Sequence, residues 1–321
     1  MIRILKAAPG LDQSNLLAKV LGPGHEVIEY DPIVPLSVQG RDADVFLLRD
    51  VPVTAAVMDA APRLKLLQRL GHHVVGVDFD HARKKGIPVA NIPASVSGGD
   101  RMVAEHALYL MLAVAKRANE CAAALKGRQL SRIVPFALTG KTLGLLGVGN
   151  TGTELARMVA GLGMRVMAVK RTADHKLARE LGFAYMGDMS GLDKVLAEAD
   201  FLSVHLPLDL ATTGFVGERV FSRMKPGSVL INIARAPIVD RAALHQALLK
   251  GPLGGAGFDV FWEEPAAPDD PLLQMPNVVV TPHIAGTTYE VMERLARVAA
   301  ENIHLVTAGR PPQYLVEEAE H

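Results

Sequence analysis

Short runs of apolar residues alternate along the chain with longer segments of helical periodicity. Such runs, bounded by turn residues, are typical of buried strands. In the first third of the chain they fall at Ile2–Leu5, Val27–Tyr30, Val45–Leu48, Leu64–Arg69 and Val89–Asn91. Further along they fall at Thr142–Gly147, Arg165–Val169, Phe201–His205, Ser228–Asn232, Gly255–Val260 and Asn277–Thr281. Because a turn or helix follows each run, the pattern predicts βαβ units and two parallel sheets, of about five and of six or more strands.

Two longer segments predict helices. The segment Asp100–Lys116 contains no Gly or Pro, and its apolar spacing predicts a long, strongly apolar helix that another part of the protein must cover. The segment Tyr289–Val306 predicts an amphipathic helix after the last strand. The pattern leaves open whether this helix completes the second set of strands or crosses back to the first.

Composition and charge narrow the function classes. The 34 Lys and Arg residues balance 34 Asp and Glu residues and are dispersed, which argues against a nucleic-acid or membrane partner. The longest apolar helix candidate, Ala107–Ala115, falls short of the roughly 20 residues that a membrane span needs. The single Cys121 excludes an intramolecular disulfide, and Met1–Lys6 does not resemble a signal peptide. We therefore expect a cytoplasmic protein.

The most informative motif is glycine-rich. Gly147, Gly149 and Gly152 form G-x-G-x-x-G between an apolar strand and a helix, the context of a dinucleotide-binding turn. In such a turn the first glycine bends the chain, the second lets the backbone approach a pyrophosphate, and the third allows close helix packing. A glycine-rich turn in another α/β fold, such as a methyltransferase, is the competing interpretation.

The end of the next predicted strand bears on the choice of cofactor. An NAD site normally places Asp or Glu there, to accept a hydrogen bond from the ribose 2′-hydroxyl. This chain has Lys170, Arg171 and Thr172, which suit a 2′-phosphate. The sequence therefore favours NADP over NAD, with two merely solvated cations as the alternative.

Three polar residues follow later strands of the second set. Arg235, Glu264 and His283 each come just beyond the carboxyl end of an apolar strand, where open α/β sheets form their ligand crevice. An arginine there can anchor a carboxylate or carbonyl, an imidazole can exchange a proton, and a carboxylate can orient that imidazole.

These segments resemble the D-isomer-specific 2-hydroxyacid dehydrogenase family. The resemblance covers nearly the whole chain and extends to Lys85–Pro93, Val103–His106, Val204–Leu208, Thr212 and Met224–Gly227. It implies an α/β fold of two Rossmann-like or flavodoxin-like parallel-sheet domains. A dinucleotide-binding domain, 99–287, is then inserted into a discontinuous substrate domain, 1–98 and 288–321. The resemblance also implies that the last helix crosses back to the first domain and that the apolar helix after Asp100 helps to form a homodimer.

The resemblance also assigns roles to site residues. Arg235 would bind the carboxylate of a 2-oxo acid and polarise its carbonyl, and His283 would be the general acid in reduction and the general base in oxidation. Glu264 would hydrogen-bond that imidazole and favour its protonated form. Further cofactor contacts are implied for the backbone of Asn150 and Thr151 at the pyrophosphate, for His205, Pro207 and Thr212 at the adenosine ribose, and for Asp259 and the Ala234 backbone at the nicotinamide.

The chain departs from the family pattern at three places. His72 and His73 would hold the substrate carboxylate through their backbone, but His73 replaces a common glycine and Val75 a common acidic residue. Pro237 stands close after Arg235, where it removes an N–H group, and the connection 126–139 lacks the tryptophan often found there. No third metal ligand accompanies the two adjacent histidines, so no metal site is expected.

The resulting hypothesis is an NADP-preferring oxidoreductase that transfers a hydride between the cofactor and a small 2-oxo or D-2-hydroxy acid of the glyoxylate or hydroxypyruvate type. Formate enzymes of this fold usually pair the histidine with Gln, so Glu264 argues against formate. The alternative from another class is a dinucleotide-sensing binding protein similar to the transcriptional corepressors that resemble this family.

Overall fold

The chain folds into two units. The computed structural model describes residues 1–8, 16–49, 51–130 and 133–318 of the 321. One unit comprises Met1–Gly99 and Thr287–His321, and the other, Asp100–Gly286, is inserted into it. Each unit has its own parallel sheet, so the expected fold class, one parallel-sheet domain inserted into another, is confirmed.

The first unit, in its described residues, contains a five-stranded sheet in the order β2-β1-β3-β4-β5, the flavodoxin-like order. Its strands are β1 (Ile2–Ala7), β2 (His25–Glu29), β3 (Val45–Leu48), β4 (Leu66–Arg69) and β5 (Val89–Ala90). Its helices are α1 (Leu16–Leu21), α2 (Leu36–Gln39), α3 (Ala55–Ala60), α4 (Phe79–Lys84), α5 (Ala94–Ser97) and α13 (Tyr289–Thr307). The inner strands β3 and β4 are nearly fully buried because helices cover both faces of the sheet, whereas the edge strand β2 has no buried residue.

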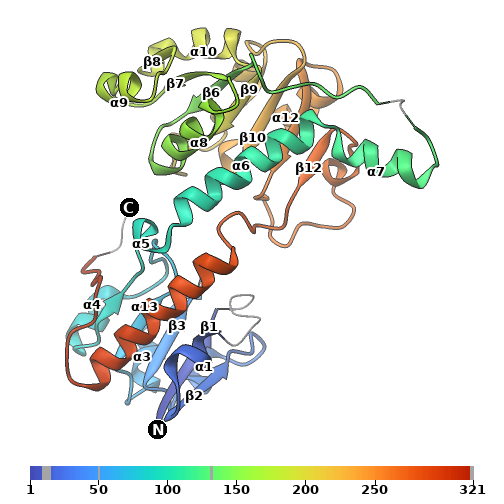
Figure 1. Cartoon of the computed structure of the whole chain (residues 1–321). Coiled ribbons are helices and arrows are strands. Elements are labelled where there is room, and N and C mark those ends of the chain that lie inside the picture. The colour runs from blue at the N-terminus through green and yellow to red at the C-terminus, as the bar shows by residue number, and fades with distance from the viewer. Residues whose placement is uncertain (9–15, 50, 131–132, 319–321) are drawn as a thin grey trace. The chain divides into compact units, whose positions relative to one another are not determined.

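The last helix, α13, runs along this first sheet (Figure 1). Its apolar face, with Ala299 and Ile303, packs against Ile4 of β1 in one core cluster. The fully buried Asn302 donates a hydrogen bond of 2.7 Å to Gln68 of β4, so the polar groups inside this packing are satisfied. The helix therefore crosses back to the N-terminal strands, as the resemblance implied.

The second unit, in its described residues, contains a seven-stranded sheet in the order β12-β11-β10-β9-β6-β7-β8. Its strands are β6 (Thr142–Leu146), β7 (Arg165–Val169), β8 (Tyr185–Gly187), β9 (Phe201–Val204), β10 (Ser228–Asn232), β11 (Leu253–Phe258) and β12 (Val278–Val280). Its α-helices are α6 (Gly99–Ala115), α7 (Ala118–Lys126), α8 (Asn150–Ala160), α9 (His175–Glu180), α10 (Leu192–Glu198), α11 (Glu218–Phe221) and α12 (Arg241–Leu249). Short 3₁₀ turns lie at η1 (Met189–Gly191), η2 (Ala236–Ile238) and η3 (Pro271–Gln274). This is the doubly wound Rossmann order with one added strand, and the order reverses between β6 and β9.

The long apolar helix α6 packs on strand β11 of the second sheet. The glycines of β11 allow this close approach, because a Cβ on Gly257 would lie 2.9 Å from the Cβ of Leu110. A Cβ on Gly255 would likewise lie 2.8 Å from a methyl carbon of Val114. One face of α6 is thus covered by this sheet, as the sequence predicted, and the helix is held close to the end of β11.

No helix in the ranges that the structure describes is both long and apolar enough to cross a membrane. The cytoplasmic location stays a prediction from the sequence.

Candidate active site

The glycine-rich turn joins β6 to α8 at the point where the strand order reverses. Gly147 has φ of 87°, and a Cβ there would lie 2.8 Å from the carbonyl oxygen of His205, so only glycine fits. At Gly149 a Cβ would meet no atom within 4 Å, because it would project into open space beside the amino end of α8. That open space next to a helix amino end fits the pyrophosphate of a dinucleotide.

The side chains at the start of α8 are held by a carboxylate that the sequence analysis missed. Asn150 Nδ2 and Thr151 Oγ1 donate to the two carboxylate oxygens of Asp100, at 3.0 and 3.2 Å. Asp100 is 50 residues away in sequence, so no local pattern connects it with the glycine turn. These contacts engage both side chains within the protein, so the backbone N–H groups at the amino end of α8, which have no intrahelical partner, are the donors that a pyrophosphate would meet.

The three residues after β7 form a basic, solvent-exposed turn. Arg171 and Thr172 are exposed and Lys170 is half-buried, and neither cation has an ion pair within 4 Å among the described residues. Arg171 nevertheless has an acidic neighbour. The pKa of Asp209 is lowered chiefly by hydrogen bonds from Thr212 and, in smaller part, by the positive charge of Arg171.

The turn after β9 lies beside the glycine-rich turn. The ring of His205 hydrogen-bonds to Ser203 Oγ through Nε2 at 2.9 Å and lies 3.6 Å from where a Cβ on Gly152 would be. Burial lowers the pKa of His205 to about 4, so the ring is neutral at pH 7. Thr212 Oγ1 donates to the carbonyl of Pro207 at 2.7 Å and thereby fixes the following loop. The His205 ring thus packs against the glycine-rich turn at Gly152.

Arg235 lies in a short turn directly after β10. The buried side chain of Asn232 spans this turn, donating to the carbonyl of Arg235 and accepting from the amide of Ala234, both at 3.0 Å. The Arg235 side chain is exposed. Pro237 falls in the first turn of η2, where an N–H group has no intrahelical partner, so the fold accommodates this departure from the family pattern.

Glu264 and His283 form a hydrogen-bonded pair. Glu264 Oε2 lies 2.7 Å from His283 Nδ1, and Glu264 Oε1 accepts from the Phe261 amide at 3.0 Å. Partial burial would raise the pKa of Glu264, but the hydrogen bonds from His283 and Phe261 and the charges of His283 and Arg235 hold it below its ordinary value. The Glu264 carboxylate therefore accepts a hydrogen bond from the Nδ1–H group of His283. The Nε2 atom of His283 has no hydrogen-bond partner among the described residues.

Asp259, assigned to the nicotinamide from sequence, is almost completely buried at the end of β11. Its carboxylate accepts from Thr281 Oγ1 at 2.5 Å, from the Ile284 amide at 2.9 Å and from the Ala285 amide at 2.8 Å. Three of the roughly four acceptor positions of this carboxylate are thus used within the protein, two of them by the backbone just after His283.

The expected substrate loop belongs to the first unit. Positive φ values fall on Gly71, at 136°, and on Gly76, at 76°, so His73 keeps an ordinary backbone conformation. The carbonyl of His72 accepts from Asn91 Nδ2 at 2.7 Å, and the rings of His72 and His73 lie 4.6 Å apart. The departures at His73 and at the exposed Val75 therefore change side chains at this loop rather than its glycine-dependent turns.

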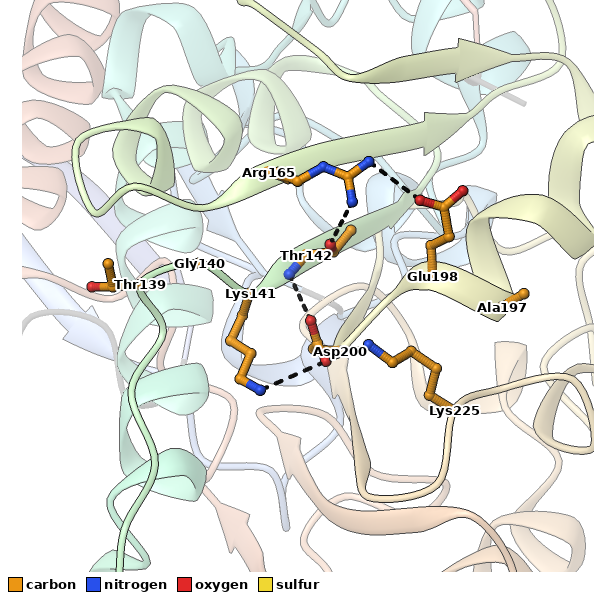
Figure 2. Close-up of a pocket in the computed structure, with 9 residues that line it drawn as sticks. All are labelled: Thr139, Gly140, Lys141, Thr142, Arg165, Ala197, Glu198, Asp200 and Lys225. Carbon is orange, nitrogen blue, oxygen red and sulfur yellow. Dashed lines mark hydrogen bonds and ion pairs between the residues drawn. The ribbon is translucent and has the colours of Figure 1, made fainter.

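A polar hollow lies at the opposite, amino edge of the second sheet (Figure 2). Lys225 Nζ lies 2.6 Å and Lys141 Nζ 4.0 Å from Asp200, and Arg165 lies 3.2 Å from Glu198. The three cations of the hollow share two carboxylates, so each cation has an acidic partner and the hollow keeps a small positive excess. Among the described residues, no three His, Cys, Asp or Glu side chains gather as metal ligands. Residues 131–132 of the connection that lacks a tryptophan lie outside the described residues.

A doubly wound sheet with a glycine-rich turn at its reversal point defines a dinucleotide-binding protein, and the comparisons with known proteins agree. Residues 108–285 match the model of the D-isomer specific 2-hydroxyacid dehydrogenase NAD-binding domain. The chain belongs to the D-isomer-specific 2-hydroxyacid dehydrogenase family, and it is an oxidoreductase that uses a nicotinamide cofactor.

Individual relatives extend the match over both units. The chain is 36% identical to a glyoxylate reductase of Korarchaeum cryptofilum over 287 residues, which cover 88% of this chain and 84% of that protein. It is 36% identical to a D-3-phosphoglycerate dehydrogenase of Archaeoglobus fulgidus, but the match spans only 52% of that longer protein. Among solved structures, an NADPH-dependent glyoxylate/hydroxypyruvate reductase of Sinorhizobium meliloti is 27% identical, with a TM-score of 0.79 over 98% of each chain.

Proposed function

We propose that this protein reduces small 2-oxo acids to D-2-hydroxy acids, with NADPH preferred over NADH. Glyoxylate and hydroxypyruvate are the representative substrates. The observation that carries the proposal is the Glu264–His283 pair, which lies beyond the carboxyl ends of β11 and β12 with the charge of Arg235 nearby. These are the groups that a carbonyl reduction needs: a proton donor, a carboxylate that orients it, and a cation for the substrate.

Residues of the second unit have separate roles in the proposed reduction. Bound NADPH supplies the hydride to the carbonyl carbon. Arg235 binds the substrate carboxylate and polarises the carbonyl oxygen, because its planar guanidinium reaches both groups at once. His283 donates the proton from Nε2 to the developing alkoxide, while its Nδ1–H stays hydrogen-bonded to Glu264. The negative Glu264 stabilises the protonated imidazole before transfer, and the reverse oxidation uses the neutral ring as base.

The preference for NADPH rests on the turn after β7. Lys170 and Arg171 supply two positive charges at the position where a carboxylate would repel a 2′-phosphate, and Thr172 adds a hydroxyl donor. The S. meliloti reductase named above is described as NADPH-dependent, which supports the same choice. The backbone of Asn150 and Thr151 would hold the pyrophosphate, the loop with Pro207 and Thr212 would border the adenosine ribose, and Asp259 and Ala234 would face the carboxamide.

We further propose that the protein is a homodimer formed through α6, α7 and the segment after them. Large apolar side chains are exposed on these elements, namely Tyr109, Leu112, Leu125, Leu130, Val134 and Phe136. Exposed apolar side chains of this size, gathered on consecutive elements, are typical of a surface that a partner covers. Leu125→Asp should therefore shift the mass measured by light scattering from dimer to monomer.

The test of the proposed function is a steady-state panel that crosses NADPH and NADH with glyoxylate, hydroxypyruvate, pyruvate, bulkier 2-oxo acids and 3-phosphohydroxypyruvate. We expect the highest kcat/KM with NADPH and the small unphosphorylated acids. Preferential turnover of the phosphorylated acid would instead place the chain with the phosphoglycerate dehydrogenases that it also resembles. Cofactor binding without turnover of any acid would support the dinucleotide-sensing alternative, which the glyoxylate reductase relatives do not favour.

A further inference from the structure

A chain of hydrogen bonds begins at His106, which none of the roles above uses. His106 Nε2 lies 2.8 Å from Thr281 Oγ1, and Thr281 Oγ1 lies 2.5 Å from Asp259 Oδ1. A hydroxyl has one proton to donate and a carboxylate only accepts, so Thr281 donates to Asp259. The Thr281 oxygen must then accept from His106, and the Nε2 atom of His106 therefore carries a proton.

The other end of this chain of bonds is the segment that follows His283. Both oxygens of Asp259 accept backbone amides there, Ile284 on Oδ1 and Ala285 on Oδ2. His283 itself has φ of 54°, in the left-handed region that side chains other than glycine rarely adopt. Such a conformation persists when the surrounding bonds fix it, and the two amide bonds to Asp259 lie immediately after it.

The packing of α6 explains why His106 is well placed for this task. The glycine face of β11 brings α6 close to the sheet, and the imidazole is only 14% exposed, between the ends of β11 and β12. Burial lowers the pKa of His106, against the opposing effect of Asp259 3.5 Å away. The imidazole of His106 is thus a neutral hydrogen-bond donor, and the ring of Tyr109 lies beside it.

We propose that His106 is a positioning residue for His283. Its Nε2–H group orients the Thr281 hydroxyl, and this hydroxyl fixes the Asp259 carboxylate. The carboxylate in turn holds the backbone segment that positions the imidazole of His283. The inference rests on the proposed role of His283 as the proton donor. Without the His106 donor, the Thr281 hydroxyl loses the only one of its partners that donates to it and is freer to turn from Asp259 toward the Phe258 carbonyl, 3.5 Å away, so Asp259 is held less firmly against the amides after His283.

The matched variants are His106→Gln, whose side-chain amide can place an N–H group near the position of Nε2, and His106→Leu, which keeps comparable volume without a donor. We expect His106→Leu to lower kcat for glyoxylate roughly 10- to 100-fold, the range that a small misplacement of a catalytic group produces. His106→Gln should stay within about threefold of the wild type. Equal losses in both variants, or no loss in His106→Leu, would overturn the proposal.

A second readout does not depend on turnover. The Nδ1 proton of His283, bonded to Glu264, is observable as a downfield NMR resonance, and we expect it to shift or broaden in His106→Leu but not in His106→Gln. An unchanged resonance in both variants contradicts the proposal even if kcat falls. If the wild type turns over no 2-oxo acid, the proposed function fails, while the resonance still decides the role of His106. Should His106→Leu not fold, Thr281→Val with Thr281→Ser as its control tests the same chain of bonds.

Discussion

Glu264 holds the imidazole of His283 by a 2.7 Å hydrogen bond to Nδ1, and a second bond from the Phe261 amide fixes the other oxygen of the same carboxylate. Because both carboxylate oxygens are engaged, the imidazole has one orientation and only its Nε2 atom is available for proton transfer. The pair therefore acts as one unit, with Glu264 determining both the tautomer and the direction of the ring.

Replacing His283 tests the proton-transfer step directly. His283→Ala should lower kcat for glyoxylate reduction by roughly 10²- to 10⁴-fold, the usual contribution of a general acid, and leave the Kd for NADPH nearly unchanged. Glu264→Gln keeps an acceptor for Nδ1–H but loses the charge, so we expect a smaller loss. Steady-state rates and fluorescence titration with NADPH measure both effects. Wild-type rates in His283→Ala would remove this residue from the mechanism.

Arg235→Lys separates geometry from charge. Lysine keeps the positive charge but loses the planar fork that contacts the substrate carboxylate and carbonyl together, so a large loss in kcat/KM is expected. Arg219, an exposed arginine of α11, provides the matched control, and Arg219→Lys should behave like the wild type. A mild effect at Arg235 would mean that this residue does not bind the substrate.

The sequence predicted the two sheets because most of their strands are buried on both faces and therefore appear as continuous apolar runs. Strand β8 escaped that analysis, since its three residues, Tyr185–Gly187, are too few to show a pattern. Arg235, Glu264 and His283 stood out as candidates because each lies within a few residues of the end of an apolar strand, and parallel strands end at one edge.

The supporting contacts were not predictable from the sequence. His106 and Thr281 are 175 residues apart, and Asn150 and Asp100 are 50 apart, so only the tertiary structure brings them together. The run Val103–His106 shows the family resemblance but not the contact, because a histidine or an aspartate on an apolar helix has the same local pattern whether or not it holds a partner.

The basic turn after β7 should decide cofactor choice. Replacing Lys170 and Arg171 with Ser should raise the KM for NADPH much more than that for NADH, because only NADPH carries the 2′-phosphate. Asp209 lies near enough for Arg171 to lower its pKa, so Asp209→Asn should release Arg171 and move the preference further toward NADPH. The ratio of kcat/KM values for the two cofactors measures both changes. Equal effects of the double variant on the two cofactors would refute the 2′-phosphate assignment.

The stability of the first unit should depend on pH through Asp44. This carboxylate is almost completely buried and accepts from the Arg3 amide at 3.0 Å and from Arg63 Nη2 at 2.9 Å. Burial raises its pKa, but the bonds from Arg3 and Arg63, with the charges of Arg63 and Lys65, bring it below the ordinary value of 3.8. A folded-state pKa below the unfolded value stabilises the fold above pH 3.8, and this contribution disappears as the pH falls through the folded-state pKa.

Asp44→Asn should therefore destabilise the protein at pH 7 by about 1–3 kcal/mol, the usual effect of weakening buried hydrogen bonds to charged groups. The difference in unfolding free energy between the variant and the wild type should shrink below about pH 4, as the wild-type carboxyl becomes protonated. Urea unfolding at pH 7 and at pH 3 measures this difference in unfolding free energy. Asp80→Asn is the control, because Asp80 is exposed beside Arg83 and its loss should change little at either pH. A difference that is the same at both pH values would show that the charge of Asp44 does not stabilise the fold.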